Sequence, residues 1–171
     1  MRKQKGFSLI ELLIVVAIIL IIAAIAIPNL MRSRIAANDS AAAANVRTLN
    51  TSEITYTTTY PTAGYVSLYS LGTGGSTTCP TGATATGACL VDPNLGCSAS
   101  TGCVKDAFAY TITVESSSQD YVIGAVPVST TAADKDFCSV PDAVIRYKPD
   151  TGGTPAAVVT TDSACNGFTS L

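Results

Sequence analysis

The sequence contains no histidine, and this absence removes two large classes of chemistry. Without imidazole, neither a Ser-His-Asp relay nor an imidazole-ligated metal site can be built. A glycine-rich stretch at residues 72–76 is not followed by the Gly-Lys-Ser/Thr of a phosphate-binding loop. We therefore predict that the chain is not an enzyme.

Basic residues are scarce as well. Ten Lys and Arg stand against twelve Asp and Glu in 171 residues, and three of the ten lie within the first five positions. Beyond that head, Arg32, Arg34 and Arg47 do not form a basic patch of the kind that binds nucleic acid. We expect no specific nucleic-acid partner.

The acidic residues do not follow a metal-binding spacing. Asp134, Asp136 and Asp142 lie close in sequence, and Ca²⁺ prefers several oxygen ligands, but the three fit no EF-hand pattern. We expect solvated turn acids and no cofactor, with a calcium site as the alternative.

The longest hydrophobic run opens the chain, at residues 7–27. These 21 residues are apolar except for Ser8 and Glu11. As a helix they would extend roughly 31 Å, enough to cross a hydrocarbon core of about 30 Å. The run is longer than the hydrophobic region of an ordinary signal peptide, which has about 7–15 residues, and no Ala-x-Ala site follows it. We predict a membrane-spanning helix that the mature protein keeps.

Glu11 is the one carboxylate inside this run. A charge in lipid costs a few kcal/mol, so such a residue usually has a partner and a function. Cleavage after Gly6 would give Phe7 a new α-amino group, four residues and about 6 Å along the helix from Glu11. A neighbouring helix shifted along its axis would place that amine beside Glu11 and neutralise both charges. The pattern predicts a filament built on identical apolar helices.

The stretch Lys5 to Leu12, with the apolar run that ends at Pro28, resembles the class III leader and helix of type IV pilins. The match is contiguous over residues 1–28 and includes leader length, the glycine before the cleavage point, the phenylalanine after it and the buried glutamate. Pseudopilins of type II secretion systems share this motif. The resemblance therefore indicates the superfamily, but it does not decide between a pilus and a type II secretion system.

The resemblance implies a processing and assembly route. A prepilin peptidase would cut between Gly6 and Phe7 and methylate the amine of Phe7, and Glu11 would pair with Phe7 of a neighbouring subunit. The expected partners are further copies of the chain, the peptidase, membrane lipid before assembly, an inner-membrane assembly platform and an outer-membrane secretin. Our first reading is the major subunit of a type IV-like pilus. The alternatives are a pseudopilin and a membrane-anchored binding module.

The six cysteines all lie beyond residue 78 and suit disulfides in an oxidising compartment outside the membrane. The basic head favours an amino terminus in the cytoplasm. We therefore expect a single-pass inner-membrane protein that becomes an extracellular filament. Two short loops would be closed by pairing Cys79 with Cys89 and Cys97 with Cys103, although other pairings among these four remain open. Cys138 and Cys165 would attach the carboxy-terminal segment to a sheet.

Pro28 stands at the outer end of the apolar run, where we expect a kink or a locally melted helical turn. Beyond it, Ile35, Ala42, Val46, Leu49 and Glu53-Ile54 recur at helical spacing. This pattern predicts that the helix continues over residues 28–56, with an apolar stripe that another element must cover.

The rest of the chain predicts loops and then strands. Residues 57–105 are rich in Gly, Pro, Ser and Thr and read as an irregular connection. Alternation predicts strands at 108–114 and 121–128, with further strands at 143–147 and 157–160. The predicted fold class is α+β: a long amino-terminal helix on an antiparallel meander of three to four strands with disulfide-closed loops, similar to the pilin fold. Its segments are a leader (1–6), an apolar helix (7–27), an amphipathic helix (28–56), a loop region (57–105), and a sheet with a carboxy-terminal segment (106–171).

Overall fold

The computed structural model describes residues 7–75, 79, 82–97, 103–115, 118–149 and 159–171. Its contacts divide the chain into two compact parts, Met1–Arg34 and Ile35–Leu171, and each is described by itself. Helix α1 (Leu9–Thr59) contributes residues to both parts. The predicted leader, residues 1–6, lies outside the described residues, and Gly6 lies there with it.

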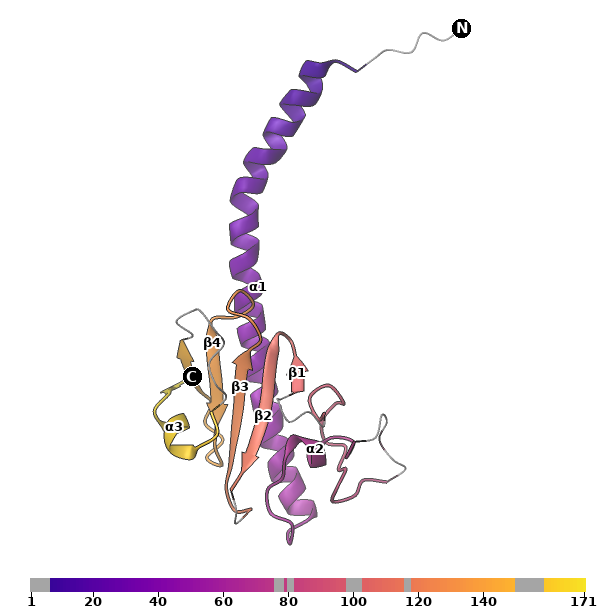
Figure 1. Ribbon diagram of the computed structural model, residues 1–171, viewed down its shortest axis with the longest axis vertical. Coiled ribbons are helices and arrows are strands. Elements are labelled where there is room, and N and C mark those ends of the chain that lie inside the picture. The colour runs from indigo at the N-terminus through magenta and orange to yellow at the C-terminus, as the bar shows by residue number, and fades with distance from the viewer. Residues whose placement is uncertain (1–6, 76–78, 80–81, 98–102, 116–117, 150–158) are drawn as a thin grey trace. The chain divides into compact units, whose positions relative to one another are not determined.

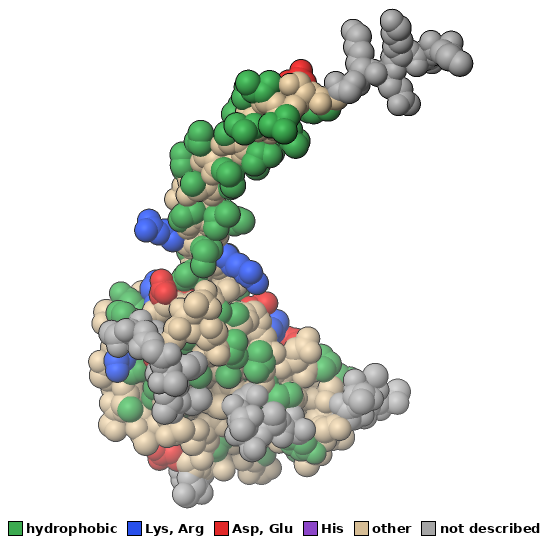
Figure 2. Space-filling model, turned by 45° about the horizontal axis from the view of Figure 1, so that its top comes forward, with side chains coloured by type: hydrophobic (Ala, Val, Ile, Leu, Met, Phe, Trp, Pro, Cys, Tyr) green, Lys and Arg blue, Asp and Glu red, His purple; other side chains and the backbone are tan. Residues whose placement is uncertain are grey.

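In the first part, α1 carries an apolar surface that its own chain does not cover. Every large apolar side chain between Phe7 and Met31 is exposed, and hydrophobic side chains cover this stretch of helix in Figure 2. An 18-residue window of α1 has a mean hydropathy of 3.3. By length and composition, α1 is the one helix among the described residues that is suited to cross a membrane.

In the second part, α1 buries one face against a sheet (Figure 1). The buried apolar residues of this face recur at spacings of three and four, so they share one side of the helix; they are Ala42, Ala43, Val46, Leu49 and Tyr56. The predicted stripe is therefore confirmed at its centre and corrected at its end. Ile54 is exposed, whereas Glu53 is fully buried.

Among the described residues, the sheet has six antiparallel strands, and each strand pairs with the next one along the chain. The strands are β1 (Cys103–Lys105), β2 (Phe108–Val114), β3 (Tyr121–Pro127), β4 (Lys135–Ser139), β5 (Arg146–Pro149) and β6 (Thr169–Ser170). The α+β class and the meander are thus confirmed, and the predicted count of three to four strands is too low. Strands β2 and β3 lie where the alternation predicted them, in the register Phe108 to Pro127.

The other strand predictions are less accurate. Strand β5 begins at Arg146, three residues later than predicted, and β1, β4 and β6 were not predicted. Residues 157 and 158 of the predicted fourth strand lie outside the described residues, and Val159 and Thr160 are not in a strand. The sequence of β4 lacks the alternation of apolar and polar residues that predicts a strand, because β4 buries Asp136 and Ser139 together with its apolar residues.

The connection from α1 to the sheet is more ordered than its composition predicted. Helix α1 ends at Thr59, three residues beyond the predicted Tyr56, and a short helix α2 (Leu68–Leu71) follows. Past α2, the backbone N–H groups of Ala88, Cys89 and Leu90 donate to the carbonyls of Ser70, Gly72 and Leu71 over 2.8–2.9 Å. A further short helix, α3 (Asp162–Asn166), precedes β6.

The disulfides join Cys79 to Cys89, Cys97 to Cys103, and Cys138 to Cys165. These are the three predicted pairings. Cys138 and Cys165 are fully buried in a small apolar cluster with Val122 and Val140, so the last bridge ties α3 to β4. A bridge that closes a loop of 27 residues contributes about 3–4 kcal/mol in the chain-entropy description.

Two glycines let the backbone of this connection cross itself. Gly72 ends α2, and a Cβ atom built on it would lie 2.2 Å from the carbonyl oxygen of Gly96. A Cβ on Gly96 would in turn lie 2.5 Å from the Cα of Gly72. Both obstacles are backbone atoms, which cannot rotate away as a side chain can. Only glycine fits at this crossing.

We predict that Gly72→Ala lowers the free energy of unfolding by about 1–3 kcal/mol, because the new methyl group must push two backbone segments apart. Gly167→Ala is the matched control, since its Cβ would meet the nearest atom at an ordinary 3.4 Å. Chemical unfolding of the detergent-solubilised chain, followed by near-UV circular dichroism, measures both. Equal stability of the two variants would contradict the close approach.

Candidate processing and assembly site

The first turn of α1 brings Ser8 and Glu11 together. The backbone N–H of Ser8 donates to Glu11 Oε2 over 3.0 Å, and the helix begins at the next residue, Leu9. This is one half of a capping box, in which an acid at the third helical position reaches back to the N-cap backbone. A carboxylate here also complements the positive end of the helix dipole. Glu11 therefore stabilises the start of the helix that carries it.

Phe7 precedes this cap and is 79% exposed. An α-amino group on Phe7 would lie next to the Ser8 N–H, at the positive end of α1. A positive charge at that end is unfavourable unless an anion lies nearby. The described residues offer Glu11 for this purpose, because no other charged residue occurs between Phe7 and Met31. Phe7 and Glu11 thus lie at the same end of α1, and their pairing between subunits stays a prediction; the sequence prediction missed Ser8, although the Ser-x-x-Glu spacing was readable.

Pro28 does not interrupt α1. The helix runs through it without a break, so the locally melted turn that we considered is not present here. Proline lacks a backbone N–H, which leaves the carbonyl of Ala24 without its usual helical partner. A bend of the helix at this point stays a prediction.

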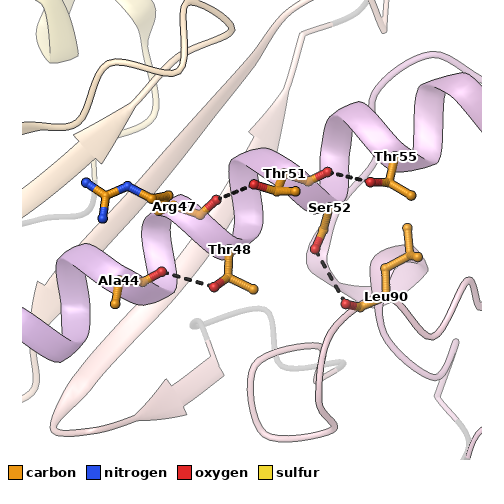
Figure 3. A pocket seen from close by; sticks show the side chains of 7 residues that line it. All are labelled: Ala44, Arg47, Thr48, Thr51, Ser52, Thr55 and Leu90. Carbon is orange, nitrogen blue, oxygen red and sulfur yellow. Dashed lines mark hydrogen bonds between the residues drawn. The ribbon is translucent and has the colours of Figure 1, made fainter.

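The outer face of α1 carries a shallow groove of about 500 Å³ beside Leu90 (Figure 3). The hydroxyls of Thr48, Thr51 and Thr55 donate to backbone carbonyls one turn earlier, over 2.8–3.1 Å. The hydroxyl donors of these three threonines are therefore used within the helix, and their methyl groups contribute to the groove. Arg47 is the one charged residue that lines it. The groove offers no pair of residues for acid–base catalysis.

The three acids of the calcium alternative are not brought together. Asp142 pairs with Arg146, whose hydrogen bonds to the carboxylate hold the pKa of Asp142 below its usual value. Asp136 is buried in β4, and the backbone N–H of Asp134 donates to Asp39. Within the described residues, no three His, Cys, Asp or Glu side chains lie close enough to hold a metal ion. The geometry gives the calcium alternative no support.

The chain matches one protein family and two known proteins over part of its length. Residues 1–27 match the family described as the prokaryotic N-terminal methylation motif. The type IV wide pilus major component PilA4 of Thermus thermophilus is 65% identical over 40 residues, which are 23% of this chain and 30% of that protein. The type IV major pilin protein PilA of Myxococcus xanthus is 49% identical over 51 residues, 30% of this chain and 23% of that protein. No solved structure matches the chain.

The chain spans less than a third of the length of either relative, and the family match covers residues 1–27, which include the first part of α1. The helix-and-sheet architecture is consistent with the α+β fold that the resemblance implied. The chain therefore carries the prokaryotic N-terminal methylation motif in residues 1–27 and is similar, over less than a third of its length, to two type IV pilus proteins.

Proposed function

We propose that this chain is the structural subunit of a type IV-like pilus, processed by a prepilin peptidase and polymerised through the first half of α1. The observation that carries the proposal is the uncovered apolar helix with a single carboxylate in its first turn. Such a surface needs lipid or other apolar helices around it, because exposure to water is unfavourable at about 25 cal/mol per Å². The two relatives reported above, a type IV wide pilus major component and a type IV major pilin, support the same conclusion.

The proposed assembly step is a charge pairing. After cleavage between Gly6 and Phe7, the methylated amine of Phe7 would meet Glu11 of a neighbouring subunit within the helix bundle. Each charge would be costly in an apolar bundle by itself, and pairing offsets that cost. Since Ser8 already occupies one oxygen of Glu11, the amine would approach the other oxygen, Oε1.

The proposal includes a sequence of locations. Before assembly the chain would span the inner membrane once, with its amino terminus in the cytoplasm and its disulfide-bonded sheet outside. Extraction by an inner-membrane platform and passage through a secretin would then give an extracellular filament. In this role the chain is a building block and not an enzyme, and it needs no cofactor.

An intact mass measured on filaments sheared from producing cells tests the proposal as a whole. The expected mass begins at Phe7, carries one additional methyl group and lacks the hydrogens lost in three disulfides. If the mature mass occurs in the membrane but not in the sheared fraction, the pseudopilin alternative replaces ours. A membrane form that begins at Met1 would leave only an anchored module.

We predict that Glu11→Ala is processed normally but assembles poorly, because the amine of Phe7 loses its partner inside the bundle. The yield of sheared filaments should fall at least tenfold, which corresponds to about 1.4 kcal/mol per subunit contact. Glu115→Ala, at an exposed acid in the second part of the chain, is the control and should assemble normally. Wild-type yield from the Glu11 variant would contradict the pairing.

We predict that Gly6→Leu keeps the leader attached, because a bulky residue at the cleavage point would not fit the site of the peptidase. The membrane fraction should then contain the full-length mass and the sheared fraction none of the chain. Gln4→Leu places the same side chain two residues earlier and should be cleaved. A normal mature mass from the Gly6 variant would show that cleavage occurs elsewhere.

A further inference from the structure

Glu53 is a buried acid that the assembly mechanism does not use. It lies in the second part of α1 with 0% of its surface exposed. The backbone N–H of Val66 donates to its Oε2 over 3.3 Å, whereas its Oε1 has no hydrogen-bond partner among the described residues. A buried carboxylate with one weak partner is costly, so this position favours the neutral form.

Val66 belongs to the connection between α1 and α2, residues 60–67, which is held at three places. Glu53 holds it at Val66. The N–H of Tyr65 donates to the carbonyl of Ser118 over 2.9 Å, and the Tyr65 ring lies edge-on to Tyr121 at 4.6 Å. Gly64 fits closely, since a Cβ there would lie 2.3 Å from the Ser118 oxygen. The connection thus covers Glu53 and excludes water from it.

Among the described residues, no cation compensates the charge of Glu53. The titratable side chains that face it are Tyr56, from its own helix, and Tyr121, from β3; burial raises the pKa of both phenols, so both stay neutral in the physiological range. The nearest further groups are tyrosines and acids: Tyr60 beside Tyr56, and Tyr65, Asp120 and Asp142 around Tyr121. Burial, opposed only by the Val66 hydrogen bond, raises the pKa of Glu53 to about 8.

We propose that the protonated carboxyl of Glu53 holds the connection 60–67 against α1, and that this connection opens more readily as the pH rises because the opened form loses the proton. The inference concerns the second part of the chain alone and does not depend on the proposed filament. It predicts a local opening of one connection, not unfolding of the sheet, whose strands are paired independently of Glu53.

The direction follows from proton linkage. In the opened form Glu53 meets water and returns toward its ordinary pKa of 4.5, whereas in the closed form the pKa is about 8. Between these two values the opened form binds fewer protons, so raising the pH favours it, by at most tenfold per pH unit. Below this window the connection is most stable, and above it the opening equilibrium becomes constant again.

Hydrogen exchange of the full-length chain in detergent micelles tests this proposal. After correction for the intrinsic exchange rate, protection of the Tyr65 and Val66 amides should fall about 10- to 100-fold between pH 5.5 and pH 7.5. Amides of β2 and β3 should not change in parallel. Glu53→Gln, which keeps a neutral acceptor for Val66, should retain the protection across the whole range. Glu115→Gln makes the same change at an exposed acid three residues before Ser118 and should behave as wild type.

A pH-independent wild type, or a Glu53→Gln variant with the full pH dependence, would overturn the proposal. If the variant does not fold, the wild type still decides it. The amide resonance of Val66 should shift with a midpoint near pH 8, as its hydrogen-bond acceptor titrates. A midpoint near pH 4.5 would show that Glu53 is ionised in the closed form.

Discussion

The first half of α1 has to be covered by something other than its own chain. Its large apolar side chains from Phe7 to Met31 are all exposed, whereas the second half of the same helix buries Val46 and Leu49 completely against the sheet. A lipid bilayer and a bundle of identical helices can both provide the cover, since neither demands a polar surface. Both also exclude water. The backbone must then be satisfied inside the helix, and any charge must find a partner, so the start of α1 becomes the critical point.

Much of the architecture was predictable where the sequence carries a strong local signal. The apolar run of α1 and the alternation in β2 and β3 are signals of that kind, because each depends on neighbouring residues alone. Strand β4 has no such signal. It buries Ser139, whose hydroxyl bonds with the amide of Asn50 on α1, 89 residues earlier in the chain. Polar residues that are satisfied by distant partners look like surface residues in a sequence, and the strand that carries them is missed.

The residues of α1 also divide into those that a local sequence signal identifies and those that it does not. Glu11 was visible because a lone carboxylate in an apolar run stands out, and Phe7 followed from the glycine before it. Helical spacing placed Glu53 and Ile54 on one stripe, but it cannot decide which of two neighbours is buried. The structure buries the acid and exposes the isoleucine, because the connection 60–67 closes over Glu53 and supplies the N–H of Val66. That contact depends on the path of the connection 60–67 after the end of α1, and no local sequence pattern predicts this path.

The two glutamates of α1 face the same electrostatic problem with different resources. Each accepts a hydrogen bond from one backbone N–H, of Ser8 for Glu11 and of Val66 for Glu53. Glu53 is enclosed by its own fold, the described residues place no cation beside it, and burial favours its neutral, protonated form. Glu11 is exposed in the single chain and lies where an amine of another copy can approach. In the proposed filament, an amine paired with Glu11 would compensate its charge and also fix the position of a second subunit. In the proposed filament, the exposed start of α1 would therefore turn the cost of a buried charge into a specific contact between copies.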